Sequence, residues 1–121
     1  MSKWFKMFFI GIICILVIGC SNNSYKIIDS NEAMDLIKKN NNAKIIDVRE
    51  SDEFNTGHIK NAYNIPLSRI ENIDYEKDTI IILYCATGVR SAEASKILSK
   101  MGYTNLYNLD GGLLNWGFDL E

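Results

Sequence analysis

One cysteine stands where a thiol would be activated for chemistry. Cys85 follows residues 79–83, an apolar and largely β-branched run that predicts a buried strand. The chain then continues through Gly88 and Arg90 into a helical pattern of apolar residues, with Ser91 as its expected N-cap. Backbone N–H groups at a helix start carry partial positive charge, and together with an arginine they favour thiolate over thiol. The pattern predicts a nucleophilic cysteine in a loop that holds something anionic.

Other polar residues are candidates for the same region. Asp47 and Arg49 stand at the carboxyl end of a second apolar run, residues 43–48. In parallel α/β sheets ligands bind beyond the carboxyl ends of strands, so Asp47 is expected near Cys85. His58 is the only histidine, and we expect it to be a packed, hydrogen-bonded side chain rather than a catalytic one. With one histidine and no CxxC pair, the sequence predicts no metal site.

The elements that must position these residues alternate along the chain. Strand patterns cover residues 25–28, 43–48, 62–65, 79–83 and 105–109, and helical patterns lie between them. Strands that alternate with helices predict an α/β layered domain with a largely parallel sheet. The length of 121 residues allows one such domain, with no internal repeat.

The charge of the chain bears on which partners it can bind. The net charge of the chain is −2, and Lys3 and Lys6 lie in the first nineteen residues, which contain no acidic side chain. The rest of the chain has eleven basic and fifteen acidic side chains and no basic cluster. We therefore expect no nucleic-acid partner.

The N-terminus has the pattern of an export signal. Two lysines precede the thirteen apolar residues Met7–Gly19, a run shorter than the roughly 20 residues that span a bilayer. The run ends at Gly19, the small residue just before Cys20, and this resembles a bacterial lipobox. We expect residues 1–19 to be a lipoprotein signal peptide and residues 20–24 to be a lipidated cysteine with a short tether.

Two acyl signals give stable anchoring where one gives marginal binding. The domain is therefore expected at the cell membrane, lipid-anchored and facing outside the cytoplasm. The alternative is an uncleaved signal anchor, in which Cys20 is only a small apolar residue.

Residues 25–121 resemble a single-domain rhodanese. The similarity is carried by motifs in the family's order and spacing, which are Asp47-Val48-Arg49, Glu53-Phe54, Gly57-His58-Ile59 with Ala62 and Asn64-Ile65-Pro66, Tyr84-Cys85-x-x-Gly88-x-Arg90-Ser91, and Leu109-x-Gly111-Gly112 with Trp116. Lys60-Asn61 departs from the family's usual Pro-Gly, in a turn outside the site. The resemblance implies a three-layer α/β/α fold with a mainly parallel five-stranded sheet.

The resemblance also implies a sulfurtransferase. Cys85 would take sulfane sulfur from a small-molecule donor of the thiosulfate or polysulfide type and pass it to a thiophilic acceptor through a persulfide. The expected substrate-binding loop is Ala86, Thr87, Gly88, Val89, Arg90 and Ser91, where Arg90 would supply positive charge for an anionic donor. Asp47 would support this loop through hydrogen bonds, with Arg49 and His58 in structural roles. No metal or organic cofactor is implied.

Two functions other than a sulfurtransferase that turns over are considered. A sulfur carrier would use the same persulfide without turning over, and would pass the sulfur to a membrane protein of sulfur metabolism. Related phosphatases and arsenate reductases enclose five residues between the cysteine and the arginine. Here four residues separate Cys85 from Arg90, and the smaller loop favours a sulfur atom over a tetrahedral oxyanion.

Overall fold

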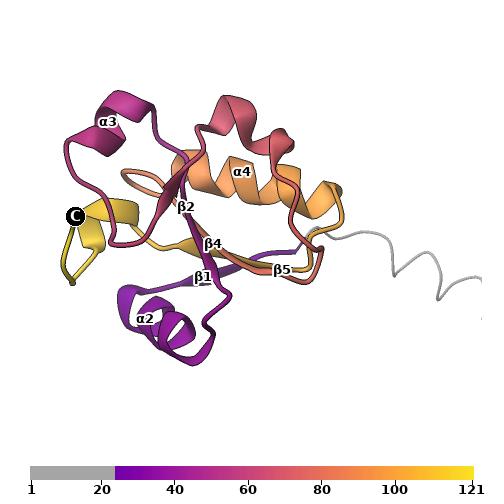
Figure 1. Cartoon of the computed structure of the whole chain (residues 1–121), viewed down its shortest axis with the longest axis horizontal. Helices are drawn as coiled ribbons and strands as arrows, with labels where there is room; N and C mark the ends of the chain where they lie inside the picture. The colour runs from indigo at the N-terminus through magenta and orange to yellow at the C-terminus, as the bar shows by residue number, and fades with distance from the viewer. Residues whose placement is uncertain (1–23) are drawn as a thin grey trace, which may run out of the picture.

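Five parallel strands form the central sheet, in the order β1-β5-β4-β2-β3 (Figure 1). The computed structural model describes residues 24–121. The strands are β1 (Lys26–Ile28), β2 (Lys44–Asp47), β3 (Tyr63–Asn64), β4 (Ile80–Tyr84) and β5 (Asn105–Leu109). Every strand pair in this sheet is parallel, which confirms the predicted α/β fold. β4 lies in the middle and is apolar throughout because both of its faces are covered.

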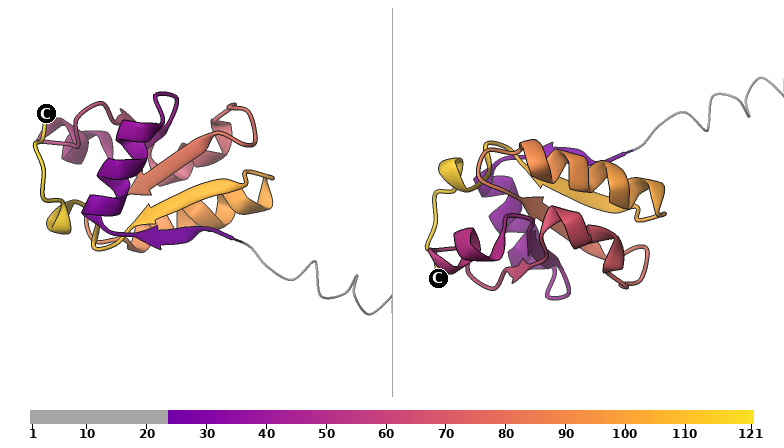
Figure 2. Two further views of the ribbon diagram at one scale, coloured as in Figure 1. Left: turned by 90° about the horizontal axis from the view of Figure 1, so that it is seen from below. Right: turned by 90° about the horizontal axis from the view of Figure 1, so that it is seen from above.

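Helices cover both faces of the sheet, as the two views of Figure 2 show. α2 (Ser30–Lys39) lies on one face. On the other face lie α4 (Val89–Lys100) and the 3-10 helix η1 (Leu67–Asn72). The short helix α3 (Ser51–Asn55) follows β2, and the 3-10 helix η2 (Gly112–Asn115) follows β5. The predicted three layers are therefore present.

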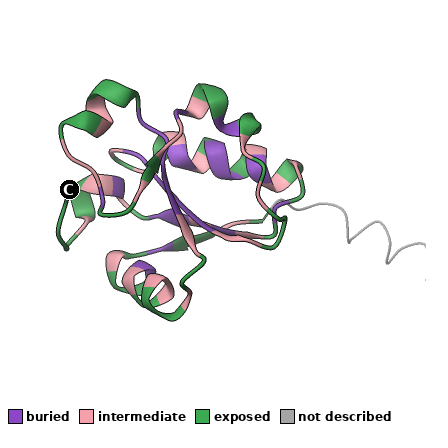
Figure 3. Cartoon of the chain, viewed as in Figure 1, coloured by how far each residue is buried: buried purple, intermediate pink, exposed green. Residues whose placement is uncertain are grey.

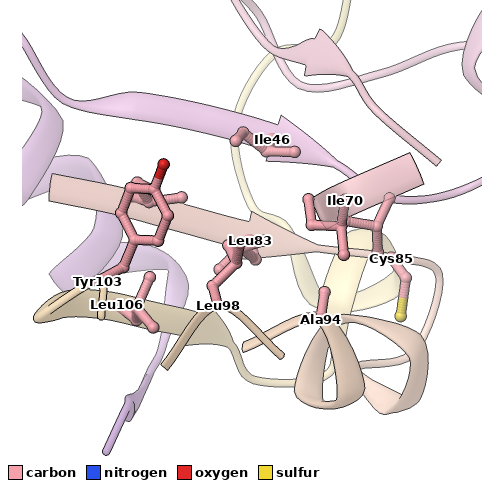
Figure 4. Packing of buried hydrophobic residues seen from close by; sticks show 10 residues of the cluster. Ile46, Ile70, Leu83, Cys85, Ala94, Leu98, Tyr103 and Leu106 are labelled. Carbon is pink, nitrogen blue, oxygen red and sulfur yellow. The ribbon is translucent and has the colours of Figure 1, made fainter. Parts of the chain in front are cut away.

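Alternation along β4 divides the core into two clusters. Ile81, Leu83 and Cys85 belong to the cluster under α4 and η1, whereas Tyr84 belongs to the cluster under α2. Side chains of successive strand residues point to opposite faces, so one strand supplies both clusters. Figure 3 shows the buried residues concentrated in the sheet and the inner side of α4. Figure 4 shows Cys85 at the end of the α4 cluster, just past β4.

Within residues 24–121, none of the helices combines the length and the hydropathy needed to cross a bilayer. The expected signal peptide, residues 1–19, and the expected lipidation site, Cys20, lie outside the described residues.

Candidate active site

The thiol of Cys85 lies at the carboxyl end of β4, inside the turn that leads into α4. The residue is 1% exposed. Its Sγ accepts a hydrogen bond from the backbone N–H of Gly88 at 3.1 Å and lies 3.5 Å from Oγ of Ser91. Gly88 has a left-handed backbone, with φ of 107°, which turns the chain around the sulfur at a conformation that favours glycine.

The surroundings of the sulfur favour the thiolate. Burial by itself would raise the pKa of the Cys85 thiol. Hydrogen bonds from the Ser91 hydroxyl and from the backbone N–H groups of Ser91, Gly88 and Thr87 outweigh burial and lower the pKa below its usual value. The predicted activated cysteine therefore has a physical basis in loop donors that point at one atom.

Ser91 has a different position from the predicted one. Gly88 is the N-cap of α4, so the expectation that Ser91 caps this helix is wrong. Ser91 lies in the first turn, fully buried. Its hydroxyl is within hydrogen-bonding distance of both Oδ1 of Asn108 and Sγ of Cys85, and it has one proton to donate to either. Asn108 in turn donates from Nδ2 to the carbonyl of Gly88 at 3.3 Å. The serine thus connects the thiol to β5 instead of capping α4.

Replacing Ser91 by alanine is expected to raise the pKa of Cys85, because the hydroxyl is among the groups that stabilise the thiolate. The measurement is the pH dependence of Cys85 alkylation by iodoacetamide, whose midpoint should move to higher pH. Ser95→Ala is the matched control, since Ser95 is also buried on α4 but donates to the carbonyl of Ser91 at 2.8 Å. Equal midpoints in the Ser91 variant and the unaltered protein would contradict this role.

The segment after β5 forms backbone hydrogen bonds with the start of the Cys85 loop. The backbone N–H of Leu113 donates to the carbonyl of Cys85 at 2.8 Å, and that of Leu114 donates to the carbonyl of Ala86 at 3.2 Å. Gly112 lies so close that a Cβ there would be 2.7 Å from the carbonyl carbon of Ala86. Val89, at the start of α4, is 74% exposed, so the outer side of the loop is open to solvent.

Arg90 is already paired. Its Nη1 and Nη2 atoms donate to Oε1 and Oε2 of Glu53 on α3, at 2.8 and 3.1 Å. Oε1 of Glu53 also accepts from the backbone N–H of Glu50 at 3.0 Å. The pKa of Arg90 is raised chiefly by the hydrogen bond to Glu53, with smaller contributions from the charges of Glu53, Cys85 and Asp47. The arginine is therefore near the sulfur, but a carboxylate occupies its bidentate face.

Asp47 and Arg49 form a buried ion pair beside the site. Nε and Nη2 of Arg49 donate to the Asp47 carboxylate at distances down to 2.8 Å, and the backbone N–H of Arg49 donates to it as well. Nη2 also donates to the carbonyl of Gly57 at 2.7 Å. These bonds lead from β2 to residue 57, and not to the loop 86–91 that Asp47 was expected to support.

His58 packs away from the sulfur. Its ring stacks on Phe54 with centroids 3.7 Å apart, and Nδ1 lies 3.0 Å from the carbonyl of Phe54. Nε2 lies 3.4 Å from a carboxylate oxygen of Glu121. The three sequence candidates Asp47, Arg49 and His58 therefore have partners elsewhere, and none of them forms a hydrogen bond with Sγ of Cys85 among residues 24–121.

Three further residues belong to the site and were not predicted from the sequence. Glu53 holds Arg90, Asn108 holds Ser91, and Gly112 backs the loop. Glu53 and Gly112 had a signal, since each belongs to one of the motifs with family spacing. Asn108 had none, because an asparagine within an expected strand has no distinctive pattern.

The geometry is suited to nucleophilic chemistry at sulfur. A thiolate with a lowered pKa needs no separate base. The N–H groups that stabilise its charge could equally stabilise a negative charge on an atom attached to it. No carboxylate or histidine contacts Sγ among the hydrogen bonds of residues 24–121.

Comparisons with known proteins agree with this geometry. The family described as "Rhodanese-like domain" matches residues 29–118. The chain is 48% identical to the uncharacterized protein YqhL of Bacillus subtilis over 77 residues. This alignment covers 62% of this chain and 61% of that protein. It is 31% identical to the thiosulfate sulfurtransferase GlpE of Coxiella burnetii, over 76% of this chain and 87% of that protein.

Solved structures have the same fold. A rhodanese-like domain protein from Staphylococcus aureus superposes with a TM-score of 0.72 at 34% identity, covering 80% of this chain and 97% of that one.

Proposed function

The chain belongs to the rhodanese-like domain family, and on this premise we propose that it is a sulfurtransferase that carries sulfane sulfur on Cys85. The observation that carries the proposal is the placement of Sγ within the donors of Thr87, Gly88 and Ser91. The four-residue spacing between Cys85 and Arg90 supports sulfur as the cargo. Donors of the thiosulfate or polysulfide type and acceptors such as cyanide or a thiol are the proposed substrates.

The reaction has two steps. The Cys85 thiolate attacks the outer sulfur of thiosulfate, the S–S bond of the donor breaks, and sulfite leaves with the electron pair. The product is a persulfide anion on Cys85, whose terminal sulfur the loop N–H groups would stabilise. An acceptor nucleophile then attacks that terminal sulfur, and the thiolate is restored as the leaving group. Covalent catalysis of this kind gives ping-pong kinetics.

The experiment is mass spectrometry of the protein after incubation with thiosulfate. One added sulfur atom is expected on the peptide that contains Cys85, and the addition should be removed by cyanide. Multiple turnovers of thiosulfate and cyanide would distinguish an enzyme from a carrier, because a carrier would load once and stop. No adduct with any sulfane donor would overturn the proposal.

We further propose that the domain is held at the outer face of the cell membrane by lipid on Cys20. Support for a productive orientation comes from Ser24, whose backbone N–H donates to Oγ of Ser99 near the end of α4. The Cys85 loop lies at the other end of this helix, on the order of 15 Å away by helical rise. A tether of a few residues would therefore leave the loop facing away from the bilayer, toward soluble donors or a membrane partner of sulfur metabolism.

Lipidation at Cys20 is tested by growing cells that produce the full chain with an alkyne-labelled palmitate. We expect label on the unaltered chain and in the membrane fraction, and loss of both in Cys20→Ser. Cys14→Ser is the matched control, because Cys14 lies inside the apolar run and should keep the label. Label that persists in the Cys20 variant would contradict the anchor.

A further inference from the structure

The pair of Glu53 and Arg90 has a feature that sulfur transfer alone does not require. An arginine beside a nucleophilic sulfur would normally offer two parallel N–H groups to an oxyanion. Here both terminal nitrogens of Arg90 donate to the two oxygens of one carboxylate, at 2.8 and 3.1 Å. The anion-binding face of the guanidinium is therefore filled by a side chain of the protein itself.

Glu53 is held in this position from two sides. Its Oε1 accepts from Arg90 and also from the backbone N–H of Glu50, so the carboxylate is fixed at the start of α3. The hydrogen bond from Arg90 is the largest cause that lowers the pKa of Glu53, to about 2. The carboxylate is consequently charged at every pH at which the protein would work.

The charges around the sulfur add to a negative value. Arg49 is cancelled by Asp47, and Arg90 by Glu53. The Cys85 thiolate is then left as an uncompensated charge, apart from its N–H donors. Thiosulfate has two negative charges, so its approach is opposed more strongly than that of a donor with one charge or none.

We propose that Glu53 is a specificity-determining residue that occupies Arg90 and makes Cys85 react faster with sulfane donors of at most one negative charge than with the dianion thiosulfate. The inference rests on the proposed sulfur transfer and names its substrate class. For a neutral hydropersulfide donor, the thiolate attacks the outer sulfur, the donor's S–S bond breaks, and the thiol leaves with the proton of the hydropersulfide. Cys85 becomes the persulfide anion, and atoms and charge balance without another reactant.

The test compares two donors that react through the same kind of bond. Thiosulfate is a dianion, and benzenethiosulfonate is a monoanion that releases a sulfinate. In Glu53→Gln, the retained oxygen can still accept from Glu50 and Arg90, while the charge and one guanidinium contact are lost. The ratio of kcat/KM for thiosulfate to kcat/KM for benzenethiosulfonate should rise about fivefold, as expected for one charge removed at a partly solvated site.

A second measurement does not depend on sulfur transfer. Iodoacetate and iodoacetamide alkylate the same thiol and are similar in size, but only the first is charged. The ratio of their rate constants at Cys85 should rise about fivefold in favour of iodoacetate in Glu53→Gln, for the same electrostatic reason. Asp52→Asn is the matched control, because Asp52 is an exposed neighbour on α3 and should leave both ratios within about twofold.

The outcomes separate the two proposals. Raised ratios in the Glu53 variant alone support the inference. Unchanged ratios, with Cys85 still reactive, would overturn it and leave Glu53 as a support of α3. Ratios that rise equally in the Asp52 variant would also overturn it, since any nearby charge would then serve. Absence of sulfur transfer from both donors in the unaltered protein would overturn the proposed function, while the alkylation ratios would still report on Glu53.

Discussion

Replacing Cys85 by serine is expected to abolish sulfur loading and transfer completely. The alcohol of serine is far less acidic than a thiol with a lowered pKa, and it cannot form a persulfide. The fold should be retained, because a serine oxygen can accept the N–H of Gly88 that the sulfur accepts now. We expect a stability change within about 1 kcal/mol, which corresponds to a melting temperature shift of a few degrees.

Mass spectrometry after thiosulfate treatment, with thermal unfolding of the same sample, checks this expectation. The chain has three cysteines, so the added sulfur must be mapped to a peptide and not only to the intact mass. Sulfur that still loads productively in the variant would contradict the role of Cys85. A large loss of stability, with sulfur still added to another cysteine, would indicate that the buried Cys85 has a structural role.

Replacing Gly112 by alanine is expected to damage both stability and the Cys85 loop. Gly112 has φ of 59°, a left-handed conformation that costs other residues roughly 1–2 kcal/mol. An added Cβ would also overlap the carbonyl oxygen of Cys85 and would lie 2.7 Å from the carbonyl group of Ala86. Because those atoms are backbone, the loop must shift. We expect a total loss of about 3 kcal/mol and a clear decrease in the rate of Cys85 alkylation.

Gly117→Ala is the matched control for this variant. Gly117 lies five residues further along, where an added Cβ meets nothing within 4 Å. Its unfolding midpoint and alkylation rate should equal those of the unaltered protein. A Gly112 variant that unfolds and reacts like the Gly117 variant would show that η2 does not hold the loop in place.

Much of the fold was predictable because its signals are local. β4 and β5 have apolar patterns that mark buried strands, and β5 was predicted with the same bounds as observed, residues 105–109. The alternation of strands and helices predicted a parallel α/β sheet, which the structure and its solved neighbours confirm. The weakest predictions concerned helix starts, since Ser91 was expected to cap α4 and Gly88 does so through its backbone.

The candidate nucleophile was also predictable, and its immediate environment partly so. Cys85, Gly88 and Ser91 lie within seven residues of sequence, so a strand end and a helix start bring them together by local geometry. The direction of the cysteine's pKa shift follows from the same geometry. The sequence was less informative about Ser91, whose hydroxyl faces the sulfur only because the serine is inside the first turn of α4.

Only the tertiary structure decided how the charges are paired. Arg90 and Glu53 are 37 residues apart, and they meet because α3 and α4 begin at the carboxyl ends of β2 and β4, which are parallel neighbours. From the sequence, Arg90 was expected to face an anionic donor, and Asp47 to support the loop. In the structure, the carboxylates of Asp47 and Glu53 form ion pairs with Arg49 and Arg90. The sequence by itself therefore determined the candidate nucleophile, because the backbone N–H groups that lower its pKa lie within the next six residues. Its electrostatic surroundings depend on long-range contacts, and only the packed fold specifies them.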